Sequence, residues 1–132
     1  MELLLDTSTL LLALFNSAKL PKNVKELIDD SENDIYVSTV SLWEIAIKHN
    51  SHPELMPYNL KKIYDVIEEY TDFHIMPIDP EYILAFEIIA KQKINRDPFD
   101  QLLVSVAKTN TMSLVTHDKN ILKYKGIKFV SY

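Results

Sequence analysis

The fold is decided at residues 3–10, which read LLLDTSTL. The three leucines form a short apolar run that is typical of a buried strand, and the polar residues after Asp6 favour the start of a helix. Four further short apolar runs of the same character lie at residues 35–37, 74–78, 114–116 and 128–130. Because such runs bounded by turn residues indicate strands, we expect five of them.

Helical patterns fill the segments between these runs. Their start signals are a proline or a capping residue: Pro21, Asn59, and the pairs Asp79-Pro80 and Asp97-Pro98. Strand and helix thus alternate, and strands that are apolar throughout indicate a parallel sheet with helices on both faces. The predicted fold class is α/β, as a three-layer α/β/α sandwich with a central parallel sheet of about five strands.

The composition of the chain limits the kinds of protein to which it can belong. It has 132 residues, of which 47% are hydrophobic and 25% charged, which favours a single domain spanning residues 1–132. The absence of cysteine excludes disulfides, thiolate metal sites and cysteine nucleophiles, and favours a cytoplasmic setting. The uncharged stretch at residues 7–18 falls short of the ~20 residues that cross a bilayer, so we expect no membrane span. A Gly-rich phosphate loop and a Gly-x-Ser-x-Gly elbow are both missing, which argues against nucleotide-fuelled and serine-hydrolase chemistry.

Two aspartates follow predicted strands. Asp6 comes after residues 3–5 and Asp118 after residues 114–117. Ligands of open parallel sheets bind beyond the carboxyl ends of the strands, so both carboxylates are expected at one edge of the sheet. Each could instead be a helix N-cap, and for either residue alone the two interpretations have about equal weight. The apolar context favours the site, because an ionised carboxylate there is costly unless a cation neutralises it.

A third acid, Glu44, lies in residues 40–47, a helical segment that is apolar on nearly every side. Such a helix is buried, so its one acid is expected to be buried or to face a cleft. The alternative is an exposed ion pair with Lys48, which would contribute only about 0.2 to 0.5 kcal/mol.

Asp97 and Asp100 stand at the start of one predicted helix, as N-cap and third residue, and share a side of its first turn. Capping and the helix dipole alone could account for both acids. Asp97 is the better placed of the two as a cap, and Asp100 as a ligand.

If Asp6, Glu44, Asp100 and Asp118 converge, their mutual repulsion is large. Each like-charge pair at ~4 Å costs about 4 kcal/mol at an effective dielectric of ~20. Several such pairs would rival the ~5 to 15 kcal/mol that keeps a domain folded, so a convergent cluster requires a bound cation or raised pKa values. Oxygen ligands without cysteine favour Mg²⁺ or Mn²⁺.

These acids and their surroundings resemble the PIN-domain family, and within it the VapC-like toxin ribonucleases of toxin–antitoxin systems. The resemblance runs along nearly the whole chain and is carried by four segments in order: residues 3–8, 37–45, 96–103 and 114–118. Asp100 and Asp118 are 18 positions apart, the spacing expected of the family's third and fourth acids, which favours Asp100 over Asp97. Two departures, Asn95 in place of a histidine and Asn110 in place of a glycine, concern the subgroup and the substrate rather than the acids.

The resemblance implies a Mg²⁺-dependent endoribonuclease, the toxin of a VapBC-type pair, in which Asp6, Glu44, Asp100 and Asp118 are both catalytic and metal-binding. It implies Mg²⁺ (or Mn²⁺) as cofactor, and RNA, a cognate antitoxin protein and a second copy of the chain in a homodimer as partners. Thr7, Ser8 and Thr116 would be supporting hydroxyls. Arg96, the only arginine, would pair with Asp97 or contact a substrate phosphate.

Two alternatives stay open. One is a catalytically inactive PIN-like domain that only binds partners, and the other is an Asp-phosphorylated signalling domain, for which the sequence places no lysine after a late strand. The net charge of −5 argues mildly against a nucleic-acid enzyme, although lysines cluster locally at Lys119, Lys123, Lys125 and Lys128.

Overall fold

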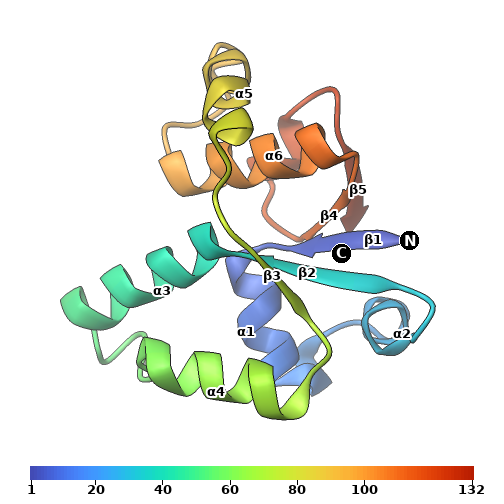
Figure 1. Ribbon diagram of the computed structural model, residues 1–132, viewed down its shortest axis with the longest axis vertical. Coiled ribbons are helices and arrows are strands. Elements are labelled where there is room, and N and C mark those ends of the chain that lie inside the picture. The colour runs from blue at the N-terminus through green and yellow to red at the C-terminus, as the bar shows by residue number, and fades with distance from the viewer.

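The five predicted strands form one fully parallel sheet in a computed structural model that describes residues 1–132. The strand order is β3-β2-β1-β4-β5, which places the first strand at the centre (Figure 1). The strands are β1 (Glu2–Leu5), β2 (Asp34–Ser38), β3 (His74–Met76), β4 (Ser113–Thr116) and β5 (Lys128–Ser131). Only the third is shorter than predicted. It ends at Met76 because Pro77 has no N–H with which to continue the ladder.

Six α-helices and two short 3₁₀ helices connect the strands. They are α1 (Thr7–Phe15), η1 (Ser17–Lys19), α2 (Lys22–Asp29), α3 (Thr39–Ser51), α4 (Leu60–Tyr70), α5 (Pro80–Ala90), α6 (Pro98–Asn110) and η2 (Ile121–Lys123). The predicted caps Asn59, Asp79 and Asp97 each accept a backbone N–H from the first turn that follows, and their role is confirmed. None of the helices is long and apolar enough to cross a membrane.

Side chains of β1 point alternately into two separate cores. Leu3 and Leu5 pack with α1, α2 and α4 on one face of the sheet, whereas Leu4 packs with α5 and α6 on the other. Figure 1 shows these two groups of helices on opposite sides of the strands. The α/β class and the three layers are therefore confirmed, and β1 is apolar throughout because it is buried on both faces.

Helix α3 departs from the expectation that it is buried all round. Trp43 is 56% exposed and Ile47 40% exposed. The reason is its position: α3 runs outward from the carboxyl end of β2 rather than across a face of the sheet, so only part of its surface is covered (Figure 1). The Trp43 ring packs edge-on against Phe99 of α6, with 5.1 Å between centroids.

The strand order creates a switch point beside β1. The chain runs from β1 outward to β2 and β3, then crosses to β4 on the other side of β1 and ends at β5. The connections that leave β1 and β4 thus diverge, and a crevice forms beyond their carboxyl ends. This is the edge of the sheet at which Asp6 and Asp118 follow their strands.

Leu4→Ala tests the two-faced burial of β1. Leu4 is fully buried, so we expect the substitution to lower the free energy of unfolding by about 2 to 5 kcal/mol, measured by urea denaturation. The matched control Leu55→Ala removes a side chain that is 76% exposed and should change it by less than about 0.5 kcal/mol. Equal losses in the two variants would contradict the assignment of the core.

Candidate active site

A cavity of about 630 Å³ opens at the switch point, and all four predicted acids line it. Asp6, Glu44, Asp100 and Asp118 come from the starts of α1 and α6, from α3 and from the loop after β4. Asp97 lines it as well. The cavity has a second, apolar part, formed by Leu11, Leu12, Phe15, Leu55, Met56 and Tyr58. One cavity therefore joins a carboxylate cluster to an apolar wall.

Asp6 is held on both of its carboxylate oxygens. Its Oδ1 accepts a hydrogen bond from the backbone N of Thr9 at 2.8 Å, and its Oδ2 accepts one from the Thr116 hydroxyl at 2.5 Å. Both Asp6 and Thr116 are buried. Asp6 is thus the N-cap of α1 and a cavity residue at the same time, so the two interpretations of its sequence position are both correct.

Asp118 is connected to the same threonine. Its backbone N–H donates to Thr116 Oγ1 at 3.0 Å, and its Oδ1 accepts from the backbone N of Asn120 and of Ile121, at 2.8 and 3.1 Å. Thr116 therefore links the two acids that flank the switch point. Asp118 also closes the turn into η2.

Glu44 is buried and paired. Only 7% of the residue is exposed. Its Oε1 accepts a hydrogen bond from the Thr7 hydroxyl at 2.5 Å, and its Oε2 lies 3.1 Å from Lys48 Nζ. The ion pair with Lys48 exists, but it joins a half-exposed lysine to a buried carboxylate rather than two exposed groups. Lys48 also lines the cavity, so it contributes a positive charge there.

The remaining two acids have different roles, as their positions in the sequence predict. Asp97 Oδ1 accepts from the backbone N of Phe99 and of Asp100, at 2.9 and 3.4 Å, and caps α6. Asp100 has no capping role. Its Oδ2 accepts one hydrogen bond, from Asn95 Nδ2 at 3.0 Å.

Burial and three neighbouring acids raise the pKa of Asp100. Burial raises the pKa of its carboxyl from the ordinary 3.8 to about 7, with further contributions from the negative charges of Asp97, Asp118 and Glu44, and the hydrogen bond from Asn95 opposes the rise. Both effects disfavour the ionised form of the Asp100 carboxyl, and burial is the larger of the two.

The donor set fits a hard divalent cation. Every acidic group at the cavity offers carboxylate oxygens, which suit Mg²⁺ or Mn²⁺. As the side chains lie, no group of three or more His, Asp or Glu residues encloses a metal position. Metal binding by the four acids stays a prediction.

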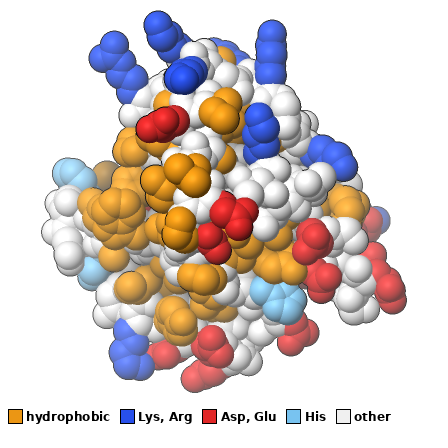
Figure 2. Space-filling view, turned by 45° about the horizontal axis from the view of Figure 1, so that its top comes forward, with side chains coloured by type: hydrophobic (Ala, Val, Ile, Leu, Met, Phe, Trp, Pro, Cys, Tyr) orange, Lys and Arg blue, Asp and Glu red, His pale blue; other side chains and the backbone are white.

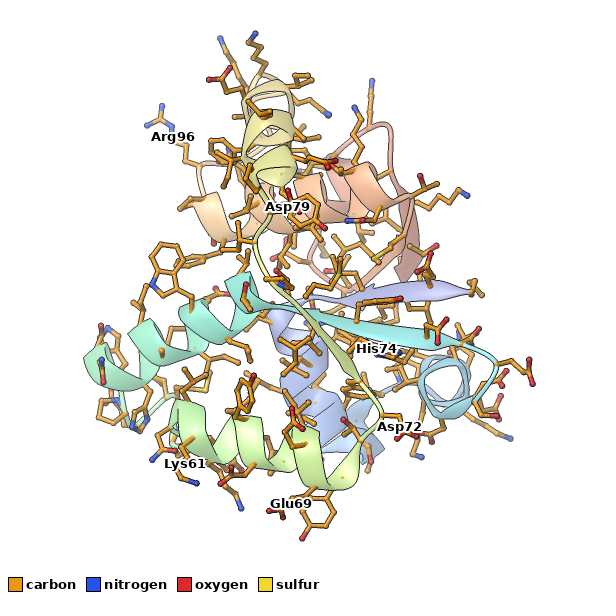
Figure 3. All side chains as sticks on the ribbon, in the orientation of Figure 1. Lys61, Glu69, Asp72, His74, Asp79 and Arg96 are labelled. Carbon is orange, nitrogen blue, oxygen red and sulfur yellow. The ribbon has the colours of Figure 1, made fainter.

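The supporting residues divide into two groups. Thr7 and Thr116 donate to the carboxylates of Glu44 and Asp6, and Ser8 lines the cavity with an exposed side chain. The predicted ion pair between Arg96 and Asp97 is wrong, whereas contact of Arg96 with a substrate phosphate stays a prediction. Arg96 forms no ion pair with any acid and is not part of the cavity lining. Figure 3 shows its side chain pointing away from the body of the molecule, because the loop before α6 turns it outward.

Sequence reasoning missed several residues. Asn95, noted only as a departure from the family pattern, donates to Asp100 and accepts from the Tyr124 hydroxyl at 2.6 Å. His117 lines the cavity as well, and its Nδ1 lies 3.0 Å from the Tyr132 hydroxyl. These contacts join positions 5, 29 and 15 residues apart, and nothing in the local sequence signals them.

Comparison with solved structures shows the fold of this chain in other proteins. It is similar to a chain of VapBC2 from Rickettsia felis, bound to a DNA fragment from the promoter, with a TM-score of 0.72 and 17% identity over 100% of this chain and 99% of the other. DNA-bound VapBC from Salmonella typhimurium matches with a TM-score of 0.73 and 18% identity, covering 99% and 98%. FitAcB from Neisseria gonorrhoeae matches with a TM-score of 0.65 and 18% identity, covering 96% and 95%. Comparison with curated protein sequences finds no match.

The sequence itself matches the model of the PIN domain over residues 3–127. This range begins in β1 and ends just before β5, so it contains all four acids of the cavity. The match and the shared fold agree with the resemblance drawn from the acids and their spacing, and the chain belongs to the PIN-domain family.

Proposed function

We propose that this protein is a Mg²⁺-dependent endoribonuclease, the toxin of a VapBC-type toxin–antitoxin pair, which cleaves RNA phosphodiesters at the cavity. One observation carries the proposal: carboxylates from four distant parts of the chain line a single cavity at the switch point of the sheet. Membership of a family whose members are generally nucleases supports it. The likeness to chains of VapBC complexes supports the toxin–antitoxin context.

The proposed ligands are Asp6, Glu44, Asp100 and Asp118, and the bound Mg²⁺ (or Mn²⁺) would supply activation of water and neutralisation of phosphate charge. The chain prepares these carboxylates to different degrees. Asp6 is fixed by Thr9 and Thr116, whereas Asp100 accepts a single hydrogen bond and has a raised pKa, so a bound cation would favour its ionised form. Lys48 limits the negative charge at Glu44 and can contact a phosphate that enters the cavity.

The inactive binding domain and the phosphoacceptor domain make different predictions. An inactive domain would bind no Mg²⁺ in a titration. A phosphoacceptor would take up phosphate from a small donor at one aspartate. The lysine at this cavity comes from α3 and is paired with Glu44, which does not match the lysine after a late strand that a phosphoacceptor needs.

An antitoxin partner would have the apolar part of the cavity available to it. Phe15 and Tyr58 stack there with 3.8 Å between ring centroids, and Leu55 of the neighbouring loop is exposed. A protein segment bound along this wall would end at the carboxylates and obstruct them. The homodimer that we propose would use α5, on which Ile83, Leu84 and Ile88 form an exposed apolar face.

Asp6→Asn and Asp118→Asn test the catalytic assignment. Each removes a charge that would hold the cation, so we expect at least about 100-fold slower Mg²⁺-dependent cleavage of RNA in a gel-based assay. Asp72→Asn, at an exposed position outside this cavity, is the matched control and should keep wild-type activity. Full activity in either site variant would refute the assignment.

Asp100→Asn tests the charge of the cavity. The pKa of Asp100 is about 7 in the folded protein, against an ordinary value of 3.8. The folded state therefore binds this proton more tightly than the unfolded state does. As a result, the metal-free protein loses stability as pH rises from about 4 to about 7. Because the carboxylate is only half-buried, we expect the variant to exceed wild type by no more than about 1 to 2 kcal/mol at pH 8. The difference should vanish below pH 4, as measured by urea denaturation.

Addition of Mg²⁺ at pH 8 is the control for this experiment. It should stabilise the wild-type protein and have less effect on the variant, because a ligand that binds only the folded state shifts the unfolding equilibrium. A variant that is no more stable than wild type at pH 8 would contradict the assigned pKa of Asp100.

Leu84→Arg tests the homodimer. Leu84 is 74% exposed, so a charge at this position leaves the fold intact but opposes burial of the α5 face, and we expect dissociation at concentrations at which wild type is dimeric. Sedimentation equilibrium measures the change. Leu55→Arg, equally exposed but on the cavity loop, should leave the dimer unaffected. A monomeric wild-type protein would disprove the proposal.

A further inference from the structure

Charge is distributed very unevenly along the chain. Residues 91–132 contain eight of the 14 Lys and Arg residues but only three of the 19 Asp and Glu residues. Those three are Asp97, Asp100 and Asp118, all at the cavity. The last third of the chain therefore carries a net positive charge outside the candidate site, although the whole protein has a net charge of −5.

Contacts between three segments of the fold bring six of these eight cations together. Gln92 and Lys125 exchange two hydrogen bonds, at 3.1 and 2.9 Å, which join the loop after η2 to the end of α5. Lys108 Nζ of α6 lies 3.7 Å from the position that a Cβ would occupy at Gly126. We call the surface formed by the exposed residues Lys91, Lys93, Lys108, Lys119, Lys123 and Lys125 the basic surface. Figure 2 shows Lys and Arg side chains around the upper part of the molecule, whereas Asp and Glu dominate its lower right.

The charges of the basic surface are not neutralised by the protein. None of its six lysines forms an ion pair, whereas Lys22, Lys25, Lys48 and Lys61 of the preceding part of the chain do. Unpaired exposed lysines carry counterions, and release of these counterions drives the binding of a polyanion.

The basic surface is anchored to the cavity. Lys119 directly follows Asp118, and the loop returns at buried Tyr124, whose hydroxyl donates to Asn95. Asn95 in turn donates to the Asp100 carboxylate. The segment that carries Lys119, Lys123 and Lys125 thus begins next to one acid of the cavity and is joined through Tyr124 and Asn95 to a second, although its lysines do not line the cavity themselves.

The surface lacks what a protein partner would need. Residues 91–132, which carry all six lysines of the basic surface, contain no exposed large hydrophobic side chain, and the nearest one along the chain, Ile88, belongs to the α5 face proposed for the homodimer. Protein interfaces depend on such anchors at their centre, whereas a phosphate backbone requires mainly positive charge. The apolar wall lies in the other part of the cavity.

We propose that the basic surface binds the phosphate backbone of the RNA substrate beside the cleaved bond, so that the strand leaves the cavity over η2 and the end of α5 and not along the apolar wall. This inference rests on the proposed function. Lysines are flexible point charges, and their contacts would therefore hold the strand without selecting its sequence.

The test compares two triple variants of equal charge change. The first is Lys119→Gln/Lys123→Gln/Lys125→Gln. The matched control is Lys19→Gln/Lys61→Gln/Lys62→Gln, which removes exposed lysines before and on α4; Figure 3 shows Lys61 on the opposite side of the sheet from α5. Binding of a labelled single-stranded oligouridylate is measured by fluorescence anisotropy in EDTA, which prevents metal-dependent cleavage, over a series of salt concentrations. Thermal unfolding confirms that each variant is folded.

We expect the first variant to bind at least about tenfold more weakly at low salt and its salt dependence to fall by about 2 in log–log slope, since each lost single-strand phosphate contact removes about 0.7. The control should stay within about twofold of wild type. Equal weakening of both variants, or of neither, would overturn the proposal. So would displacement of the oligouridylate by polyglutamate at equal charge concentration, which would indicate an acidic protein as the partner.

A parallel cleavage assay with Mg²⁺ separates this inference from the proposed function. If wild type does not cleave RNA but the first variant still loses binding, the basic surface stands and the enzymatic assignment fails. If wild type cleaves RNA and all variants bind alike, the enzymatic assignment stands and the basic surface is refuted.

Discussion

The hydrogen bond from the Thr116 hydroxyl to Asp6 joins the ends of the two strands on which the site depends. β1 and β4 are paired in parallel through Leu3–Ser113, Leu4–Leu114 and Leu5–Val115, so that Asp6 follows the end of β1 at Leu5 and Asp118 follows the end of β4 at Thr116. Without this register, the first and last acids would not face the same crevice. Burial of Leu3, Leu4 and Leu5 on both faces fixes the register, because a shift by one residue would exchange the side chains of the two cores.

Stability and chemistry compete for the same carboxylates. Asp6 and Asp97 cap helices, Asp118 closes a turn, and Glu44 is held by a hydroxyl and a lysine. Each of these contacts lowers the cost of placing an acid beside the others. Asp100 is the exception: it caps no helix, and burial together with the negative charges of Asp97, Asp118 and Glu44 raises its pKa to about 7. A cation that enters the cavity would relieve strain at the residue that is least constrained.

Most of the fold could be predicted from the sequence, because buried strands and capped helices leave local patterns. The apolar run at residues 3–5 and the pair Asp97-Pro98 are examples. The four acids that line the cavity could also be predicted. Each is identified from its place after a strand or within a helix, and such a place is set by the neighbouring residues in the sequence. The outward direction of the Arg96 side chain and the exposure of Trp43 on α3 could not be predicted from the sequence. The direction of a loop and the covering of a helix are set by distant elements. Asn95 was out of reach for the same reason: its partner Tyr124 is 29 residues away.

The separation of charge between the two parts of the chain gives the molecule a permanent electric dipole. A strong polyanion exerts a torque on such a dipole and turns the positive end towards itself before any contact is made. At physiological ionic strength this torque acts only within roughly a Debye length, about 8 Å, so it corrects orientation in the last step of an encounter rather than speeding long-range approach. If the basic surface binds RNA as proposed, the dipole would turn that surface towards the strand although the protein as a whole is acidic.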